Sequence, residues 1–172
     1  AKFTSIAWKD NGFYYTRYPA PKAGAELTAA NKGSAIYYHV LGTDPSKDAV
    51  VHNDPAHPDY YFGALTTEDE RFLMITASES TSGNSLKVKD LSKNDSKFVV
   101  ISGGFENEYS VIDNFGDELL VMTNYKAPNQ QLVLVHPDRS NPDQWKTFVA
   151  QDTADVLQSV DVCGGRVICN YL

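Results

Sequence analysis

The sequence has few basic residues and no long apolar run. Its 172 residues carry 15 Lys and Arg side chains against 22 Asp and Glu, which gives a formal net charge of −7. Proteins bind phosphate backbones with clustered basic side chains, so we expect no nucleic-acid partner. No apolar run approaches the roughly 18 residues of a membrane helix, and no signal-peptide pattern opens the chain. The composition indicates a soluble, acidic globular domain without a membrane partner.

Cysteine is also scarce, with only Cys163 and Cys169. A Gly-Gly turn at 164–165 would pair Cys163 with Arg166 in a hairpin and Cys169 with Val160, which keeps the two sulfurs apart. We therefore expect no disulfide. A chain without disulfides suits a reducing compartment, and we expect a cytoplasmic location, with the periplasm as the alternative.

Motifs of catalytic chemistry are missing as well. The sequence contains no Gly-x-Ser-x-Gly nucleophile elbow and no glycine-rich phosphate loop. His52 and His57 could offer two imidazoles to a metal, but the prolines around them favour a connecting loop. Neighbouring carboxylates such as Asp69 and Glu70 fall where turns are expected. We predict no catalytic residue, no metal site and no cofactor in this chain.

Strand-forming residues, in contrast, are abundant. Ten Tyr, eight Phe and many Val and Ile stand in short runs that Gly, Asp, Asn and Pro interrupt. The Ala-rich segment 23–31 has one apolar anchor, Leu27, so we expect a loop there rather than a helix. Four segments repeat a pattern of strand, polar turn and apolar strand: 3–8 with 13–18, 60–65 with 71–77, 109–113 with 118–124, and 156–162 with 166–172.

The first three of these segments continue into a third and a fourth strand. With Phe13, Phe72, Leu119 and Val167 as equivalent positions, the repeat spacings are 59, 47 and 48 residues. Four antiparallel strands that recur about every 50 residues are typical of propeller blades, whereas a β-sandwich is the simpler alternative. We predict an all-β β-propeller fragment of about three and a half four-stranded antiparallel blades. The added strands are expected at 36–42 and 48–51, 86–91 and 98–102, and 131–136 and 147–150.

The blade-like repeats define the expected domain organisation. They span residues 2–51, 59–102, 108–150 and 156–172. A closed propeller needs about four blades or more, so we expect this chain to be part of a longer propeller. Connections from the second to the third strand, and from one blade to the next, leave an antiparallel blade on one side, which we call the loop face. The longest is expected at 18–35, and loops of such length are often functional.

Several runs resemble the β-propeller of prolyl oligopeptidases. The most specific is Tyr-Tyr-His-Val-Leu-Gly-Thr at 37–43. The resemblance covers essentially the whole chain and implies a seven-bladed propeller, of which this chain is the central part. It also implies a parent serine peptidase that cleaves after proline in short peptides. The other matching runs lie at 3–8, 12–15, 17–19, 123–129 and 145–146.

The same resemblance implies partners and site residues. Its catalytic Ser, Asp and His belong to a separate α/β-hydrolase domain that this sequence does not contain. That domain of the same parent chain and proline-containing peptides are the expected partners. By position, Tyr61, Ser78 and Thr81 fall where family members line an outer substrate subsite. Some relatives carry Arg and Cys where this chain has Ser78 and Thr81, and ordinary loop residues are the alternative interpretation.

Two functions are open at this point. The chain is either the substrate-gating propeller segment of a prolyl oligopeptidase, itself non-catalytic, or a non-enzymatic propeller module for protein–protein interaction. The sequence downstream of residue 172 would distinguish them, because only the first continues into a hydrolase domain. An open arc of blades also exposes faces that a closed ring buries, so we expect the isolated chain to self-associate.

Overall fold

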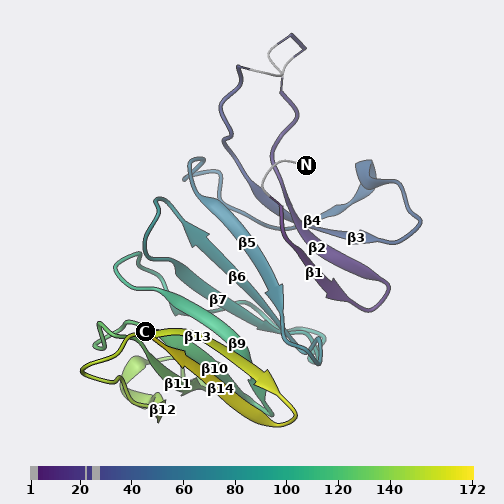
Figure 1. The fold of residues 1–172 in the computed structure, drawn as a ribbon. Coiled ribbons are helices and arrows are strands. Elements are labelled where there is room, and N and C mark those ends of the chain that lie inside the picture. The colour runs from purple at the N-terminus through teal and green to yellow at the C-terminus, as the bar shows by residue number, and fades with distance from the viewer. Residues whose placement is uncertain (1–3, 22, 25–27) are drawn as a thin grey trace.

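The computed structural model describes residues 4–21, 23–24 and 28–172. Within these residues, fourteen β-strands form four antiparallel sheets, three with four strands and one with two (Figure 1). Each four-stranded sheet keeps its strands in chain order, as propeller blades do. The predicted all-β fold of three and a half blades is confirmed.

The strands follow one another blade by blade. The first blade contains β1 (Ile6–Lys9), β2 (Gly12–Arg17), β3 (Ala35–Val40) and β4 (Ala49–Asn53). The second contains β5 (Tyr61–Thr66), β6 (Phe72–Ser78), β7 (Ser85–Asp90) and β8 (Val99–Ser102). The third contains β9 (Tyr109–Phe115), β10 (Glu118–Thr123), β11 (Gln131–Val135) and β12 (Lys146–Val149). The fourth sheet contains β13 (Leu157–Cys163) and β14 (Arg166–Tyr171).

Each predicted strand overlaps one of these elements. The first was expected from residue 3, which lies outside the described residues. The hairpin register predicted for the cysteines is confirmed, because Cys163 pairs with Arg166 and Cys169 pairs with Val160. Both cysteines are free. The described part of segment 23–31 forms turns and irregular backbone, with neither helix nor strand.

Three short 3₁₀ helices were not predicted: η1 (Pro45–Lys47), η2 (Pro137–Arg139) and η3 (Pro142–Gln144). All three have proline in the first turn, where its missing N–H costs nothing. In each, the preceding side chain accepts a hydrogen bond from a backbone N–H inside the turn. These capping residues are Asp44, His136 and Asn141. No helix among the described residues is long and apolar enough to cross a membrane.

Apolar cores fill the seams between neighbouring blades. Along β6, Phe72 and Met74 belong to the core shared with the third blade, whereas Leu73 and Ile75 belong to the core shared with the first. This division follows from the alternation of side chains along a strand. The second blade is therefore covered on both faces, and its β6 is buried over four consecutive residues.

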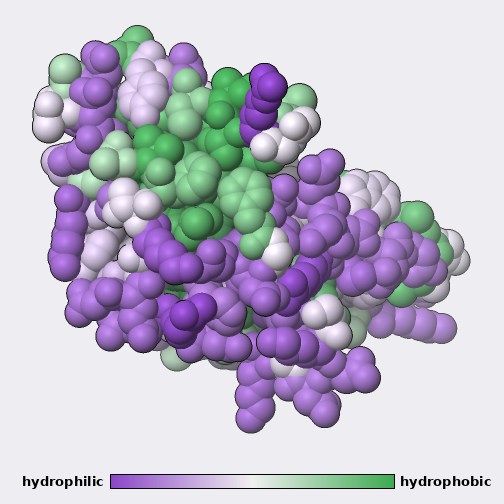
Figure 2. All heavy atoms as spheres, turned by 90° about the horizontal axis from the view of Figure 1, so that it is seen from below, coloured by the Kyte–Doolittle hydropathy of each residue, from purple (hydrophilic) through white to green (hydrophobic). Residues whose placement is uncertain are grey.

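Apolar side chains also remain on the surface. Seen from below, they gather toward the left of Figure 2, the side on which Figure 1 draws the third and fourth sheets. Exposed large apolar residues of these two sheets include Phe115, Phe148 and Ile168. Phe115 and Phe148 contact each other with ring centroids 6.1 Å apart. The self-association expected from uncovered blade faces remains a prediction.

Candidate functional site

The three residues predicted for substrate contact lie at the loop-face edge of the second blade. Tyr61 opens β5 and Ser78 closes β6, and the two are direct cross-strand partners. Thr81 lies in the exposed connection that follows β6. Burial raises the pKa of Tyr18, which follows β2, and the Tyr61 hydroxyl raises it further. The structure thus pairs Tyr61 with Ser78 and places Thr81 three residues after Ser78 in the chain.

A cleft of about 520 Å³ lies beside this edge. The imidazole of His57 stacks on the ring of Tyr60, with centroids 4.7 Å apart and planes 7° apart. Tyr60 in turn meets Phe105 edge-on at 5.0 Å. The lining of the cleft therefore combines the stacked rings of His57 and Tyr60 with the carboxylates of Asp59 and Glu79. Its lining residues are Ala56, His57, Pro58, Asp59, Tyr60, Glu79 and Ser80.

His57 is oriented by a carboxylate. Its Nδ1 lies 2.9 Å from Oδ2 of Asp54. This hydrogen bond lowers the pKa of the Asp54 carboxyl, and backbone N–H groups of Ala56 and His57 lower it further. Asp54 also receives the backbone N–H of Ala56 at 3.1 Å, as an Asx turn requires. The ring of His57 is therefore held by a turn of its own connection.

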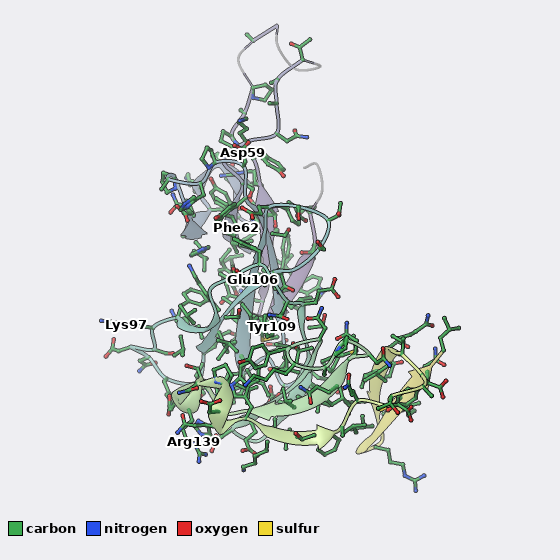
Figure 3. All side chains as sticks on the ribbon, turned by 90° about the vertical axis from the view of Figure 1, so that its left-hand side faces the viewer. Asp59, Phe62, Lys97, Glu106, Tyr109 and Arg139 are labelled. Carbon is green, nitrogen blue, oxygen red and sulfur yellow. The ribbon has the colours of Figure 1, made fainter. Side chains whose placement is uncertain are left out.

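The first blade fixes the connection that carries these rings. The buried Ser34 hydroxyl donates to the carbonyl of Tyr60 at 2.8 Å and accepts from the N–H of Phe62 at 3.3 Å. The N–H of Gly33 donates to the carbonyl of Pro58 at 2.6 Å. Figure 3 shows Asp59 at the loop-face end of the molecule with Phe62 below it, inside the blade.

The third blade fixes the connection that carries Thr81. Gly83 has φ +72°, and a Cβ there would collide with the carbonyl oxygen of Phe105, so only glycine fits. Asn84 makes two hydrogen bonds with the backbone of Tyr109, donating to its carbonyl at 3.1 Å and accepting from its N–H at 2.9 Å. Both connections that border the site are thus anchored to a neighbouring blade.

The described residues of this edge include neither a metal cluster nor an activated nucleophile. Among residues 4–21, 23–24 and 28–172, no three His, Cys, Asp or Glu side chains are placed to hold a metal ion. Within the same ranges, no serine, threonine or cysteine hydrogen-bonds to a histidine, as an activated nucleophile would. The edge instead offers hydroxyl groups and an aromatic surface to a ligand.

Sequence reasoning missed the aromatic part of this edge. It weighed His57 only as a metal ligand and did not connect it with Tyr60 or Phe105. A signal for the stacked pair was present, since a histidine and a tyrosine three residues apart flank Pro58 in a short connection. The contact with Phe105 joins connections 45 residues apart, so no local pattern contains it.

The comparisons with known proteins bear on this architecture. The family profile described as the N-terminal β-propeller domain of prolyl oligopeptidase matches residues 1–172. The chain belongs to the prolyl oligopeptidase family. Its N-terminal β-propeller region is the part represented here, and the family resemblance inferred from the sequence is confirmed.

Curated relatives and solved structures agree with this assignment. A prolyl endopeptidase of Elizabethkingia meningoseptica is 36% identical over 172 residues, covering 99% of this chain and 24% of its own length. Prolyl oligopeptidase A of Amanita bisporigera is 36% identical over 173 residues, covering 94% of this chain and 22% of its own. The chain therefore spans about a quarter of the length of these relatives.

The fold also superposes on solved structures of the family. Prolyl oligopeptidase B from Galerina marginata, in a structure bound to a 35mer hydrolysis and macrocyclization substrate, superposes with a TM-score of 0.89 at 27% identity. That match covers 99% of this chain and 24% of the solved one. The catalytic domain of the family is not in this chain.

Proposed function

We propose that this chain is the substrate-gating propeller segment of a serine peptidase that cleaves after proline in short peptides. Membership of the prolyl oligopeptidase family carries the proposal, and relatives named prolyl endopeptidases support it. The segment itself is non-catalytic. An α/β-hydrolase domain of the same parent chain is its partner, and the loop face is turned toward that domain. Two free cysteines support the cytoplasmic location that we propose.

Tyr61, Ser78 and Thr81 contribute to an outer substrate subsite in this proposal. Their placement at one edge of one blade supports it, as does the anchoring of both bordering connections by neighbouring blades. An edge that is fixed before binding loses little conformational entropy when a peptide arrives. The stacked His57 and Tyr60 extend the same edge with an apolar surface on which a proline ring can pack.

A binding experiment tests the subsite. The chain labelled with ¹⁵N is titrated with a proline-containing peptide and followed by two-dimensional NMR, and shifts are expected at Tyr61, Ser78 and Thr81. We expect the double variant S78A/T81A to weaken binding several-fold. Thr43→Ala is the control, because Thr43 is exposed like Thr81 but lies in the turn between β3 and β4, on the side opposite the loop face. Equal affinities for the double variant and the control would contradict the subsite.

An activity assay tests the non-catalytic role. The purified chain is incubated with a chromogenic prolyl peptide, with and without a serine-directed inhibitor. No inhibitor-sensitive turnover is expected, because no described serine has a histidine base. Turnover that scales with the amount of chain and disappears with the inhibitor would refute this assignment.

A further inference from the structure

His52 lies inside the seam between the first two blades. It belongs to β4, where it pairs with the fully buried Ile36 of β3. Its ring meets Phe62 of β5 edge-on, with centroids 5.0 Å apart, and contacts Phe98, just before β8, at 6.0 Å. The half-buried imidazole therefore lies between its own blade and aromatic rings of the second blade.

One nitrogen of this ring has no partner. Nε2 of His52 is buried and forms no hydrogen bond. A neutral imidazole needs a proton on only one nitrogen, so Nε2 can remain an unprotonated acceptor among aromatic rings. A protonated imidazole carries an N–H on both nitrogens, and Nε2 would then bury a charged donor without an acceptor. Such a group is costly in an apolar seam.

The charges around His52 disfavour that proton. Burial lowers the pKa of His52, and Lys87 of β7 lowers it further. Lys89 of the same strand places its Nζ 5.9 Å from the ring centre of Phe98, which adds a second cation on that side. Asp54 acts in the opposite direction, but its carboxylate is engaged by His57. The facing residues Ile36 of β3 and Phe62 of β5 are uncharged.

We propose that His52 is an acid-sensitive latch of this seam: a proton on Nε2 loosens β4 and the connection 54–60 from the second blade. The connection leads directly into the loop-face edge at Tyr61, so loosening the seam also loosens that edge. Above pH 6.5, the ordinary pKa of histidine, the ring is neutral and its packing stabilises the seam fully. Below that pH, His52 binds a proton more readily in the unfolded or opened chain than in the closed seam. The free energy that keeps the seam closed therefore falls as the pH falls. This inference does not depend on the proposed peptidase role.

Hydrogen exchange tests the latch. Amide protection of the chain is measured by mass spectrometry at pH 7.5 and pH 5.5, after correction for intrinsic exchange rates. Protection across residues 48–62 is expected to fall by up to tenfold per pH unit below 6.5. Residues 119–123 of β10, in the third blade, serve as the internal reference. His52→Phe keeps an aromatic ring without a proton site and is expected to remove the acid response.

A control variant tests a histidine outside the seam. His136→Asn preserves a side-chain acceptor for the N–H of Asp138 and should retain the wild-type acid response. An unchanged response in His52→Phe would overturn the latch. An NMR titration of the His52 imidazole in the wild-type chain gives a second measurement that needs no variant. A titration midpoint clearly below pH 6.5 supports the latch, and a midpoint at or above 6.5 overturns it.

Discussion

The seam between the first and second blades and the seam between the second and third contain different polar groups. Between the first and second blades, neutral groups join the sheets: the Thr16 hydroxyl donates to the carbonyl of Phe62 at 2.7 Å, and His52 packs as an aromatic ring. Between the second and third blades, Arg71 of the second blade donates to the carbonyl of Gly116 and to the carboxylate of Asp117 in the third. The same guanidinium donates to Asp90 of its own blade at 3.1 Å. The first seam also has an ion pair, between Lys9 and Glu70 at 3.8 Å, but this pair lies at the hairpin edge. The buried polar group is the neutral Thr16 in the first seam and the carboxylate Asp90 beside the second, so we call them the neutral seam and the charged seam.

The difference predicts that the two seams lose stability in different ranges of acid pH. Despite its burial, the Asp90 carboxyl has its pKa lowered to about 2 by hydrogen bonds from Arg71 and Ser92. A carboxyl with a lowered pKa stabilises the fold above its ordinary pKa near 3.8, and this stabilisation is lost only as the pH falls toward 2. His52 responds below pH 6.5. A single chain thus carries one seam sensitive to mild acid and another that resists it.

The largest effect is expected from the apolar core of the charged seam. Leu119 is fully buried in the cluster that contains Phe72 and Val121. Leu119→Ala removes apolar contacts and leaves a cavity, which costs about 3 kcal/mol of unfolding free energy. Urea denaturation measures this loss. Leu41→Ala is the control, since Leu41 is 52% exposed and its truncation should change stability little. Similar losses for both variants would contradict the packing described here.

A smaller effect is expected from the ion pairs. Arg71→Ala leaves the buried Asp90 without its main cation and should cost about 2 kcal/mol at pH 7. The variant should also show a weaker loss of stability between pH 4 and pH 2 than the wild type. Denaturation curves at several pH values measure both quantities. Arg139→Ala is the control, because Arg139 is exposed at the opposite end of the molecule from Asp59 (Figure 3). If the stability of Arg71→Ala depends on pH between 4 and 2 as that of the wild type does, Arg71 does not set the acid response of the charged seam.

The repeat could be predicted from the sequence because blades are local structures. The two strands and the turn of each hairpin lie close together in the sequence. The Gly-Gly turn at 164–165 was therefore enough to predict the strand partners of Cys163 and Cys169. The seams could not be predicted in the same way. The alternation on β6 shows that Phe72 and Leu73 face different sides, but nothing local says which blade each one meets. The contacts of Arg71 with Asp117 and of Tyr60 with Phe105 join residues about 45 apart.

In the candidate site too, the local features could be predicted from the sequence and the contacts between blades could not. Tyr61, Ser78 and Thr81 were placed by family resemblance, and their shared edge follows from hairpin register, which is local. The anchors of that edge are contacts between blades. Ser34 and Asn84 each precede a third strand and hold the start of the next blade, yet one is a hydroxyl and the other an amide. A sequence repeat does not reveal such equivalence, because the geometry is shared while the residue type is not.

The smallest predicted effect tests the neutral seam. Thr16 is fully buried, and Thr16→Val keeps its shape while removing the hydroxyl that donates to Phe62. We expect a loss of about 1 kcal/mol, because a carbonyl that loses one hydrogen bond is less costly than an orphaned N–H. Ser34→Ala should cost more, since it leaves the N–H of Phe62 without its partner.

Urea denaturation at pH 7.5 ranks these two variants, with Thr43→Val as the exposed control. The order Ser34→Ala, Thr16→Val, Thr43→Val follows directly from which backbone group each substitution leaves unpaired. A cost for Thr16→Val equal to that of Ser34→Ala would mean that the two hydroxyls act through packing rather than through hydrogen bonding. Packing contacts, and not hydrogen bonds from neutral hydroxyl groups, would then account for the stability of the neutral seam.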